Sequence, residues 1–298
     1  MLDSLLYHLA RCFVGLIQAL PVRTVARLGR MGGAVAYWLD ARHRRVAIAG
    51  LTQVFGAEKS TTEIRELARE NFRRLGENYA CAVKTASMTM EELRPHLEFV
   101  CGPELLQLPS NTKPRSHVVA IGHFGNFELY ARWKQLCPAY ECATTYRGLK
   151  QESLSRLMQQ LRERSGCLFF ERRTEGGALR AFMNRPGVML GLLADQHAGN
   201  GERLPFFGRE CSTSTAPAVF ALRYRCVLRT GICYRIGLAQ WRVEAGPEIP
   251  THEGGTPRSV ADITLDINRA FEAAIRRDPA NWFWVHNRWK APKASKPQ

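Results

Sequence analysis

The chain has 298 residues, 45% of them hydrophobic and 23% charged, so it is long enough to bury a sizeable core and has an ordinary globular composition. Its formal net charge of +15 is unusual and draws it towards polyanions, which are nucleic acid, an anionic membrane surface or an acidic protein. Nine cysteines, an odd number without a CxxC pair, argue against a disulfide framework and favour reduced thiols in a protein that faces the cytosol.

The N-terminal stretch MLDSLLYHLARCFVGLIQALPV places apolar residues at helical spacing. Its longest charge-free run, Cys12 to Val22, is too short to span about 30 Å of hydrocarbon, and no small-residue cleavage site follows it. Residues 1–50 contain seven arginines, and a second apolar patch, MGGAVAYWL, covers 31–39. We therefore expect an amphipathic helix that lies in a membrane interface, although a helix docked on the protein's own core has the same pattern.

Beyond residue 60, apolar residues alternate between helical and strand-like spacing. TTEIRELARENFRRLGENYACAV predicts a helix capped by Thr61 or Thr62, and VVAIG (118–122) predicts a short buried strand. The other predicted elements follow in chain order: a helix over NFELYARWKQLC, a helix over 152–166 that ends at Gly166, the strand CLFFE, the helix GALRAFMNR, the strand GVMLGLLAD, a polar loop over 196–211, the helix STAPAVFALRYR, the strands CVLRTGICYRIG and QWRVEAGPEI, and a helix over 260–277.

Strands that alternate with helices indicate an α/β protein with a single domain, in which helices flank a largely parallel central sheet. An N-terminal amphipathic helix precedes this domain. The sequence contains no internal repeat and no linker long enough to separate two domains. We therefore expect a membrane-associating helical segment over 1–40, an α/β domain over 41–290 and a disordered tail over 291–298.

The stretch GHFGNFE follows the strand VVAIG and places His123 and Glu128 five residues apart, with Gly125 and Asn126 between them. Functional groups of a parallel sheet collect at the carboxyl ends of its strands, where His123 is expected. Glu128 can accept a hydrogen bond from one imidazole nitrogen and leave the other as a base. Gly125 would let the backbone approach a substrate, and N–H groups beside Asn126 would face developing negative charge. A core histidine satisfied by a carboxylate is the structural alternative.

Other chemistries lack their usual signatures. No serine or cysteine stands beside the histidine–acid pair, so the pattern favours activation of a substrate hydroxyl over covalent catalysis. The chain has no GxSxG elbow, HExxH motif, Walker loop or GxGxxG loop. His117 would lie about 20 Å from His123 along a strand, too far to share a metal ion. No recognition motif accompanies the basic charge, so we expect no metal, no cofactor and no nucleic acid.

These residues carry a resemblance to a known family. GHFGNFE resembles the first motif of the lipid A biosynthesis acyltransferase family, the late lauroyl/myristoyl acyltransferases of the HX4(D/E) acyltransferase superfamily. TTYRGLK (144–150) is similar to the family's Tyr-Arg segment, and 192–226 resembles its Asp-Gln and Phe-Phe-Gly segment. PANWFWVHNRWK (279–290) resembles its tryptophan-rich block, so the resemblance covers nearly the whole chain.

The resemblance implies a glycerolipid acyltransferase-like fold and transfer of a fatty acyl chain from a thioester to a hydroxyl of a membrane glycolipid, with a lipid A precursor as the leading choice. The donor would be acyl carrier protein or, alternatively, coenzyme A. His123 would remove the hydroxyl proton while Glu128 orients the imidazole. Arg147 is the candidate for binding the oxyanion or an acceptor phosphate. Asp195, at a strand end, would position His123 or the acceptor, and Gln196 would join the substrate-binding surface.

The same resemblance implies attachment to the anionic surface of the inner (cytoplasmic) membrane, with the catalytic domain facing the cytoplasm. Several alternatives stay open from the sequence. Related enzymes acylate mannosylated phosphoinositides, and an aminolipid is a further class of acceptor. A cysteine-dependent hydrolase is the alternative enzyme, and a basic protein that binds membranes or nucleic acid is the non-enzyme alternative. For Arg147 and Asp195, the structural alternatives are a solvated surface arginine and a loop cap.

Overall fold

The computed structural model of the protein describes residues 2–102, 105, 114–148 and 151–290; the tail predicted to be disordered, 291–298, lies outside the described residues. A seven-stranded sheet forms the centre of the molecule. Its strands are β1 (Leu97–Val100), β2 (His117–Ile121), β3 (Glu141–Tyr146), β4 (Leu168–Glu171), β5 (Val188–Leu193), β8 (Val227–Gly237) and β9 (Gln240–Ala245).

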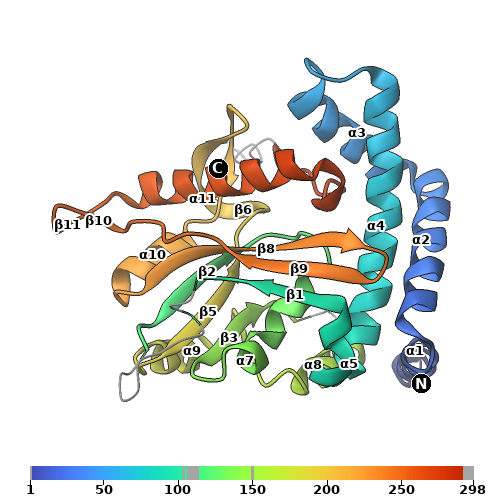
Figure 1. The fold of residues 1–298 in the computed structure, drawn as a ribbon, viewed down its shortest axis with the longest axis horizontal. Coiled ribbons are helices and arrows are strands. Elements are labelled where there is room, and N and C mark those ends of the chain that lie inside the picture. Colours follow the sequence, from blue (N-terminus) through green and yellow to red (C-terminus); the bar gives the residue numbers. More distant parts are fainter. Residues whose placement is uncertain (1, 103–104, 106–113, 149–150, 291–298) are drawn as a thin grey trace, which may run out of the picture.

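The sheet has the strand order β1-β9-β8-β2-β5-β3-β4 (Figure 1). Neighbouring strands are parallel except for β8 and β9. The predicted class is therefore confirmed: a single α/β domain with a largely parallel sheet and flanking helices. The helices are α1 (Leu2–Ala19), α2 (Val22–Leu39), α3 (Ala41–Phe55), α4 (Thr61–Ser87), α5 (Met90–Leu93), α7 (Trp133–Leu136), α8 (Glu152–Glu163), α9 (Gly176–Met183), α10 (Ala216–Arg223) and α11 (Val260–Arg277).

Strand β2 lies between β8 and β5 and is buried along its whole length. Val118 and Ala120 point to one face, whose core includes side chains of α9, α10 and α11. Val119 and Ile121 point to the other face and pack in a second core that includes side chains of α2, α4 and α7. Both faces are covered, which is why the strand reads as an unbroken apolar run in the sequence.

Three local predictions were wrong. The cap of α4 is Ser60, one residue before the predicted threonines. Its Oγ accepts the N–H of Glu63, and the Glu63 carboxylate accepts the N–H of Ser60, so the pair forms a capping box that satisfies two backbone donors. The helix expected over NFELYARWKQLC is a 3-10 helix, η2 (Phe127–Arg132), followed by the single turn of α7. The polar loop expected over 196–211 is a hairpin of β6 (His197–Phe206) and β7 (Arg209–Thr213).

The missed hairpin has a recognisable signal. Leu204 and Phe206 are buried, whereas Arg203 and Pro205, which alternate with them, are exposed. This alternation is that of a strand covered on one face, and the many polar residues conceal it in the sequence. The remaining short elements are η1 (Arg94–His96), β10 (His252–Glu253), β11 (Thr256–Pro257) and η3 (Pro279–Asn281).

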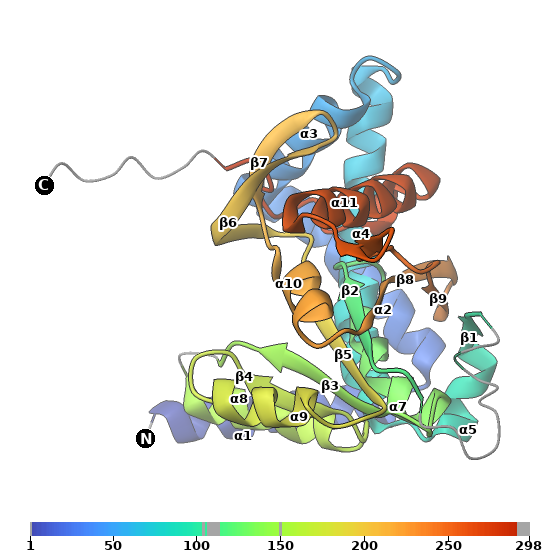
Figure 2. The ribbon, with the colours of Figure 1, turned by 90° about the vertical axis from the view of Figure 1, so that its left-hand side faces the viewer.

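Within the predicted N-terminal segment, helices α1 and α2 cover residues 2–19 and 22–39. Helix α1 packs against α4 and runs alongside α8 (Figure 2), and Ser153 of α8 donates a hydrogen bond to Asp3 of α1 over 2.8 Å. Helix α2 packs along α4 (Figure 1). None of the helices in the described part of the chain is both long enough and apolar enough to cross a membrane.

Glycines allow the close contact between α2 and α4. Gly33 of α2 lies directly over the carbonyl group of Phe72 in α4, and a Cβ atom at this position would collide with that group. The adjacent Gly32 faces solvent and has open space around it. Substitutions at these two neighbouring glycines therefore distinguish the effect of the helix contact on stability from the effect of helix propensity.

We expect Gly33→Ala to lower the stability of the protein by about 1–3 kcal/mol, because the backbones of two packed helices must move apart. Gly32→Ala is the matched control and should raise stability by about 0.5–1 kcal/mol through helix propensity alone. Denaturant unfolding of the full chain measures both values. Equal effects of the two substitutions would contradict the close contact.

Candidate active site

The parallel pairing of β2 and β5 brings two polar residues together. The last residues of the two strands, Ile121 and Leu193, are register partners, and the N–H of Ala194 donates to the carbonyl of Ile121 over 3.0 Å. His123 and Asp195 each lie two residues beyond a strand end. They therefore emerge side by side at the carboxyl edge of the sheet, where sites of parallel sheets form.

Asp195 is the hydrogen-bond partner of His123. One carboxylate oxygen, Oδ1, lies 2.7 Å from Nδ1 of His123. The other, Oδ2, accepts the backbone N–H of His123 and the indole N–H of Trp282, each over 2.8 Å. Asp195, one of the residues predicted to form the site, therefore contacts His123 through both its imidazole ring and its backbone N–H.

The buried carboxyl of Asp195 is charged. Burial at 1% exposure by itself would raise its pKa, but the neighbouring imidazole, the bonds from His123 and the bond from Trp282 outweigh burial and hold the pKa below its usual value. A charged carboxylate only accepts hydrogen bonds, so Nδ1 of His123 carries the proton. The second ring nitrogen, Nε2, then has a free lone pair, as a general base requires.

Aromatic rings hold the imidazole plane in place. The rings of Phe127 and Phe283 have their centroids 4.8 Å and 5.7 Å from that of His123. The His123 side chain keeps 15% of its surface exposed, on the side of a cavity that it lines. Its orientation is therefore fixed by Asp195 on one side and by the two rings on others.

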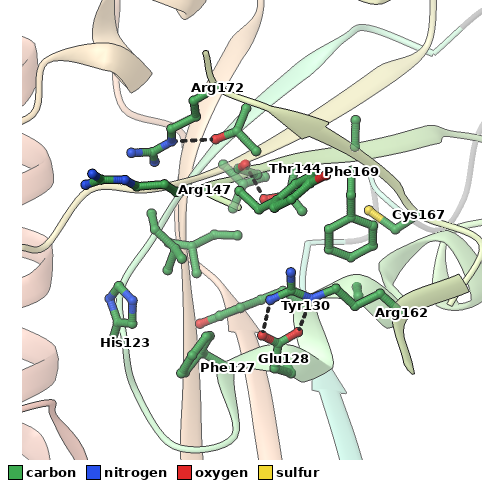
Figure 3. Close-up of a pocket in the computed structure, with 18 of the residues that line it drawn as sticks. His123, Phe127, Glu128, Tyr130, Thr144, Arg147, Arg162, Cys167, Phe169 and Arg172 are labelled. Atoms are coloured by element: carbon green, nitrogen blue, oxygen red, sulfur yellow. Dashed lines mark hydrogen bonds and ion pairs between the residues drawn. The ribbon is translucent and has the colours of Figure 1, made fainter. Parts of the chain in front are cut away.

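The expected hydrogen bond between His123 and Glu128 is absent, and this prediction was wrong. Glu128 pairs with Arg162 of α8: Oε1 accepts from Nη2 over 2.7 Å and Oε2 accepts from Nε over 3.2 Å (Figure 3). The chain turns at Gly125, where φ is 52°, and then enters the 3-10 helix η2. Glu128 therefore faces α8, and Asp195 occupies the imidazole nitrogen that Glu128 was expected to bind.

The expected substrate-facing roles of Gly125 and Asn126 are also wrong. Gly125 approaches β8: a Cβ atom there would lie 2.6 Å from the carbonyl oxygen of Cys233, and its N–H donates to Asn281 over 3.1 Å. Asn126 is buried and donates to the hydroxyl of Thr85 over 3.2 Å. Both residues shape the loop that carries His123, and neither is among the residues that line the cavity.

A cavity of about 540 Å³ extends from His123 between the sheet and the helices η2 and α8. This volume is in the range of small-molecule sites. Its mouth is polar: His123, Arg147, Arg172 and Gln196 all line it. Figure 3 shows the guanidinium groups of Arg147 and Arg172 at the His123 end, whereas Phe169 is at the other. Most of the remaining wall is apolar, with residues such as Val119, Ile121, Phe127, Met158, Met189 and Leu193.

The arginines at the mouth differ in how they are held. The exposed Arg147 lies at the end of β3, and Arg172, just beyond β4, donates from Nε to the hydroxyl of Thr145 over 3.2 Å. Both guanidinium groups point away from the apolar interior (Figure 3). The predicted site residues Arg147 and Gln196 therefore do line the same cavity as His123.

Two cysteines line the cavity but are poor nucleophiles. Burial raises the pKa of Cys142 to about 12 and raises that of Cys167 as well, so both thiols are protonated at neutral pH. This argues against the cysteine-dependent hydrolase. Across the described ranges, no three histidine, cysteine or acidic side chains converge as they would around a metal ion.

The tryptophan-rich segment contributes to the site in a way that the sequence did not reveal. Trp282 and Trp284 are buried in the core as their size suggests, but Trp282 also donates to Asp195. Nearby, Nε2 of His286 accepts the backbone N–H of His197 over 3.1 Å. Burial lowers the pKa of His286, which keeps this nitrogen neutral and able to accept. The segment 195–197 is thus held at both ends by residues 282–286.

The sequence also matches a known protein family. The sequence model of a family described as bacterial lipid A biosynthesis acyltransferase matches residues 1–291. A comparison with individual curated proteins gives no match. The match spans the amphipathic helices, the strand ends that carry His123 and Asp195, and the tryptophan-rich segment. The chain belongs to the bacterial lipid A biosynthesis acyltransferase family, and it is therefore an acyltransferase that acts with an acyl donor on a lipid A-type acceptor.

Proposed function

We propose that His123 is the general base of acyl transfer to a hydroxyl of the lipid A-type acceptor, with Asp195 in the orienting role expected of Glu128. The observation that carries this proposal is the 2.7 Å contact between His123 Nδ1 and the buried Asp195 carboxylate at the mouth of the cavity. The carboxylate fixes the tautomer and stabilises the imidazolium ion that forms during the reaction. General-base assistance of this kind contributes about 10²–10⁴ in rate.

The proposed reaction needs no covalent enzyme intermediate. Nε2 of His123 takes the proton of the acceptor hydroxyl while the hydroxyl oxygen forms a bond to the thioester carbonyl carbon. The tetrahedral oxyanion then collapses, the carbon–sulfur bond breaks, and the leaving thiolate takes the proton from Nε2. Arg147 and Arg172 supply positive charge at this end of the cavity, for the oxyanion or for a phosphate of the acceptor.

The apolar part of the cavity is the proposed site of the acyl chain. Its wall is largely apolar, with the face of the sheet on one side and α8 on the other. Burying each methylene group contributes about 0.8 kcal/mol, so a fatty chain binds here with useful affinity. The thioester carbonyl then lies beside His123, and the acceptor approaches from the side of Arg147.

Glu128 and Arg162 have a different proposed role. Their ion pair joins η2 to α8 and forms part of the cavity wall. Both side chains are mostly buried, at 23% and 19% exposure, so each charge depends on the other. The pair therefore holds α8 over the acyl site and contributes to the reaction through the shape of the cavity.

The exposed apolar faces of α1 and α2 support membrane attachment. Leu9, Phe13 and Leu16 of α1 are 60–63% exposed and recur at helical spacing. Met31, Val35 and Trp38 of α2 form a similar row that is 55–66% exposed. Arg11, Arg23 and Arg27 are exposed on the same helices. We propose that these helices lie in the anionic surface of the inner membrane, with the catalytic domain in the cytoplasm.

Acyl carrier protein is the proposed donor because it is strongly acidic and this chain carries a net charge of +15. Arg172 lines the cavity mouth, and Arg173 beside it is exposed. Arg203 is already paired with Glu210 over 3.3 Å, so its charge is partly compensated. Arg172 and Arg173 are therefore the stronger candidates for contact with an acidic carrier.

The first prediction from this proposal concerns the base. We expect His123→Ala to lower kcat/KM by about 10²–10⁴, and Asp195→Asn to lower it by a similar factor because an amide no longer enforces the reactive tautomer. Acyl transfer from a carrier-protein thioester to a lipid A precursor, followed by mass spectrometry, measures both. Thermal unfolding checks that each variant is folded. Near wild-type activity in a folded His123→Ala enzyme would refute the proposal.

A second prediction distinguishes the role of Glu128 from that of Asp195. Glu128→Gln should reduce activity less than Asp195→Asn, and a further Arg162→Gln substitution should restore part of the loss, because it removes the charge left unpaired. The pH dependence of kcat/KM should stay that of the wild type in the double variant, since His123 and Asp195 are intact. Strictly additive losses would show that the two residues do not act as a pair.

A third prediction concerns the membrane. The double substitution Phe13→Glu with Leu16→Glu should reduce sedimentation with vesicles of phosphatidylethanolamine and phosphatidylglycerol by about tenfold or more, because the loss of apolar burial and the added negative charge both oppose binding. Val219→Glu is the matched control, since Val219 is 41% exposed on α10 and lies outside these helices. Equal vesicle binding by both proteins would contradict an interface formed by α1.

A fourth prediction concerns the donor. Arg173→Glu should raise KM for the carrier-protein thioester several-fold at about 0.1 M salt, and the effect should shrink at about 1 M salt as the Debye length falls from about 10 Å to about 3 Å. Arg203→Glu should have a smaller effect because Glu210 already neutralises it. Arg269→Glu on α11, where Arg269 is 72% exposed and pairs with Asp266 over 2.8 Å, is the control for a charge reversal away from the cavity. If KM for carrier and coenzyme A thioesters responds alike, the donor surface lies elsewhere.

A further inference from the structure

The acyl site proposed above follows the direction of the strands. Because side chains two residues apart point to the same face, three alternate residues of β5 form its sheet side: Leu193, Gly191 and Met189. Leu193 lies nearest the carboxyl edge, where His123 is, and Met189 lies deepest. Figure 3 shows the same polarity, with His123 at one end of the cavity and Cys167 at the other.

The middle of this row has no side chain. Gly191 is paired with Val119 of β2 and Thr144 of β3, and all three residues line the cavity. A Cβ atom at Gly191 would lie 2.6 Å from the Cδ1 atom at the tip of Ile121. An added methyl group must therefore enter the cavity or push the Ile121 tip into it. A glycine inside a buried strand lowers strand stability, so its value here is the space that it leaves.

Large buried side chains close the inner end. Met189 is 3% exposed and Trp133 is 4% exposed, and both line the cavity. Cys142, the register partner of Met189 on β3, is also buried and lies beside it. The methionine side chain is long and flexible, and its atoms beyond Cβ occupy the space into which a longer chain would extend.

The geometry sets a length. Each strand residue advances about 3.3 Å, so the distance along the strands from Leu193 to Met189 is about 13 Å. The distance from the level of His123 to Met189 is about 20 Å. An extended chain of single bonds advances about 1.2 Å per bond, so these distances correspond to roughly 11–16 carbons. The cavity therefore fits a medium-length to long fatty chain whose end meets Met189.

We propose that Met189 and Gly191 select the length of the transferred acyl chain: Met189 closes the inner end of the cavity, and Gly191 keeps the passage to it open. This inference rests on the proposed placement of the chain in the cavity. It assigns chain-length selection to two residues that take no part in the chemistry at His123.

The test is a competition among saturated acyl thioesters of acyl carrier protein that are shorter and longer than the cavity. Purified full-length enzyme transfers them to a lipid A precursor, and mass spectrometry gives the chain-length distribution of the product. Met189→Ala should shift the preferred chain about two to three carbons longer, the length of the side-chain atoms removed. Gly191→Ala should shift it shorter and lower kcat/KM for the wild-type chain by about tenfold or more, as expected for one methyl group in an apolar pocket.

Controls separate selection from damage to the fold. Met189→Val is the milder variant if Met189→Ala does not fold, and it should shift the distribution in the same direction. Leu190→Val removes a methylene group from the same strand on the opposite face, where Leu190 is fully buried, and should leave the distribution unchanged. If folded Met189 and Gly191 variants both keep the wild-type distribution, the inference is overturned while the proposed function stands. Absence of transfer by the wild type would overturn the proposed function itself.

Discussion

The site depends on one buried charge. The carboxylate of Asp195 is removed from water, and a buried ion is tolerated only where other polar groups replace its hydration. The imidazole and backbone of His123 and the indole of Trp282 provide this replacement. The same contacts orient the imidazole, so the requirement to stabilise Asp195 and the requirement to direct His123 are met by one arrangement of atoms.

The cavity beside this charge has a polar end and an apolar end. At the carboxyl edge of the sheet, loops carry His123 and Arg147, and deeper along the strands the wall is apolar. Since residues of a strand alternate between faces, β2 and β5 line the cavity with every second residue and support the other core with the rest. Helix α8 closes the opposite side, held by the ion pair between Glu128 and Arg162.

A second buried carboxylate joins the N-terminal helices to the sheet. Glu77 of α4 is fully buried; it accepts from Arg235 of β8 over 2.7 Å, from the N–H of Ala239 over 2.9 Å and from Arg30 of α2 over 3.3 Å. Arg30 also donates to Glu70 over 2.9 Å. Together with the glycine contact, these bonds fix the position of α2 relative to the cavity, and the bond from Ser153 of α8 to Asp3 fixes that of α1. A membrane bound by these helices would therefore have a defined orientation to the active site.

Local patterns in the sequence predicted much of the fold. The helix over 260–277 appears with the expected bounds, and the apolar runs of β2 and β5 appear as buried strands, because residue spacing reflects which faces of an element are covered. The position of His123 at a strand end also followed from local reasoning. The resemblance to the family could also be seen in the sequence, because its motifs are short segments in a fixed order, and the family model matches residues 1–291.

The sequence offered both Glu128 and Asp195 as partners of His123, and only the tertiary structure decided between them. Asp195 is 72 residues away in the chain and becomes the partner because β5 pairs directly with β2. Glu128, five residues away, is carried towards Arg162 by a positive-φ glycine and a 3-10 helix in place of the expected α-helix. The spacing of residues along the chain reflects the geometry of a single helix or strand. The neighbour of a strand depends on the order of all the strands in the sheet, and no local pattern determines that order.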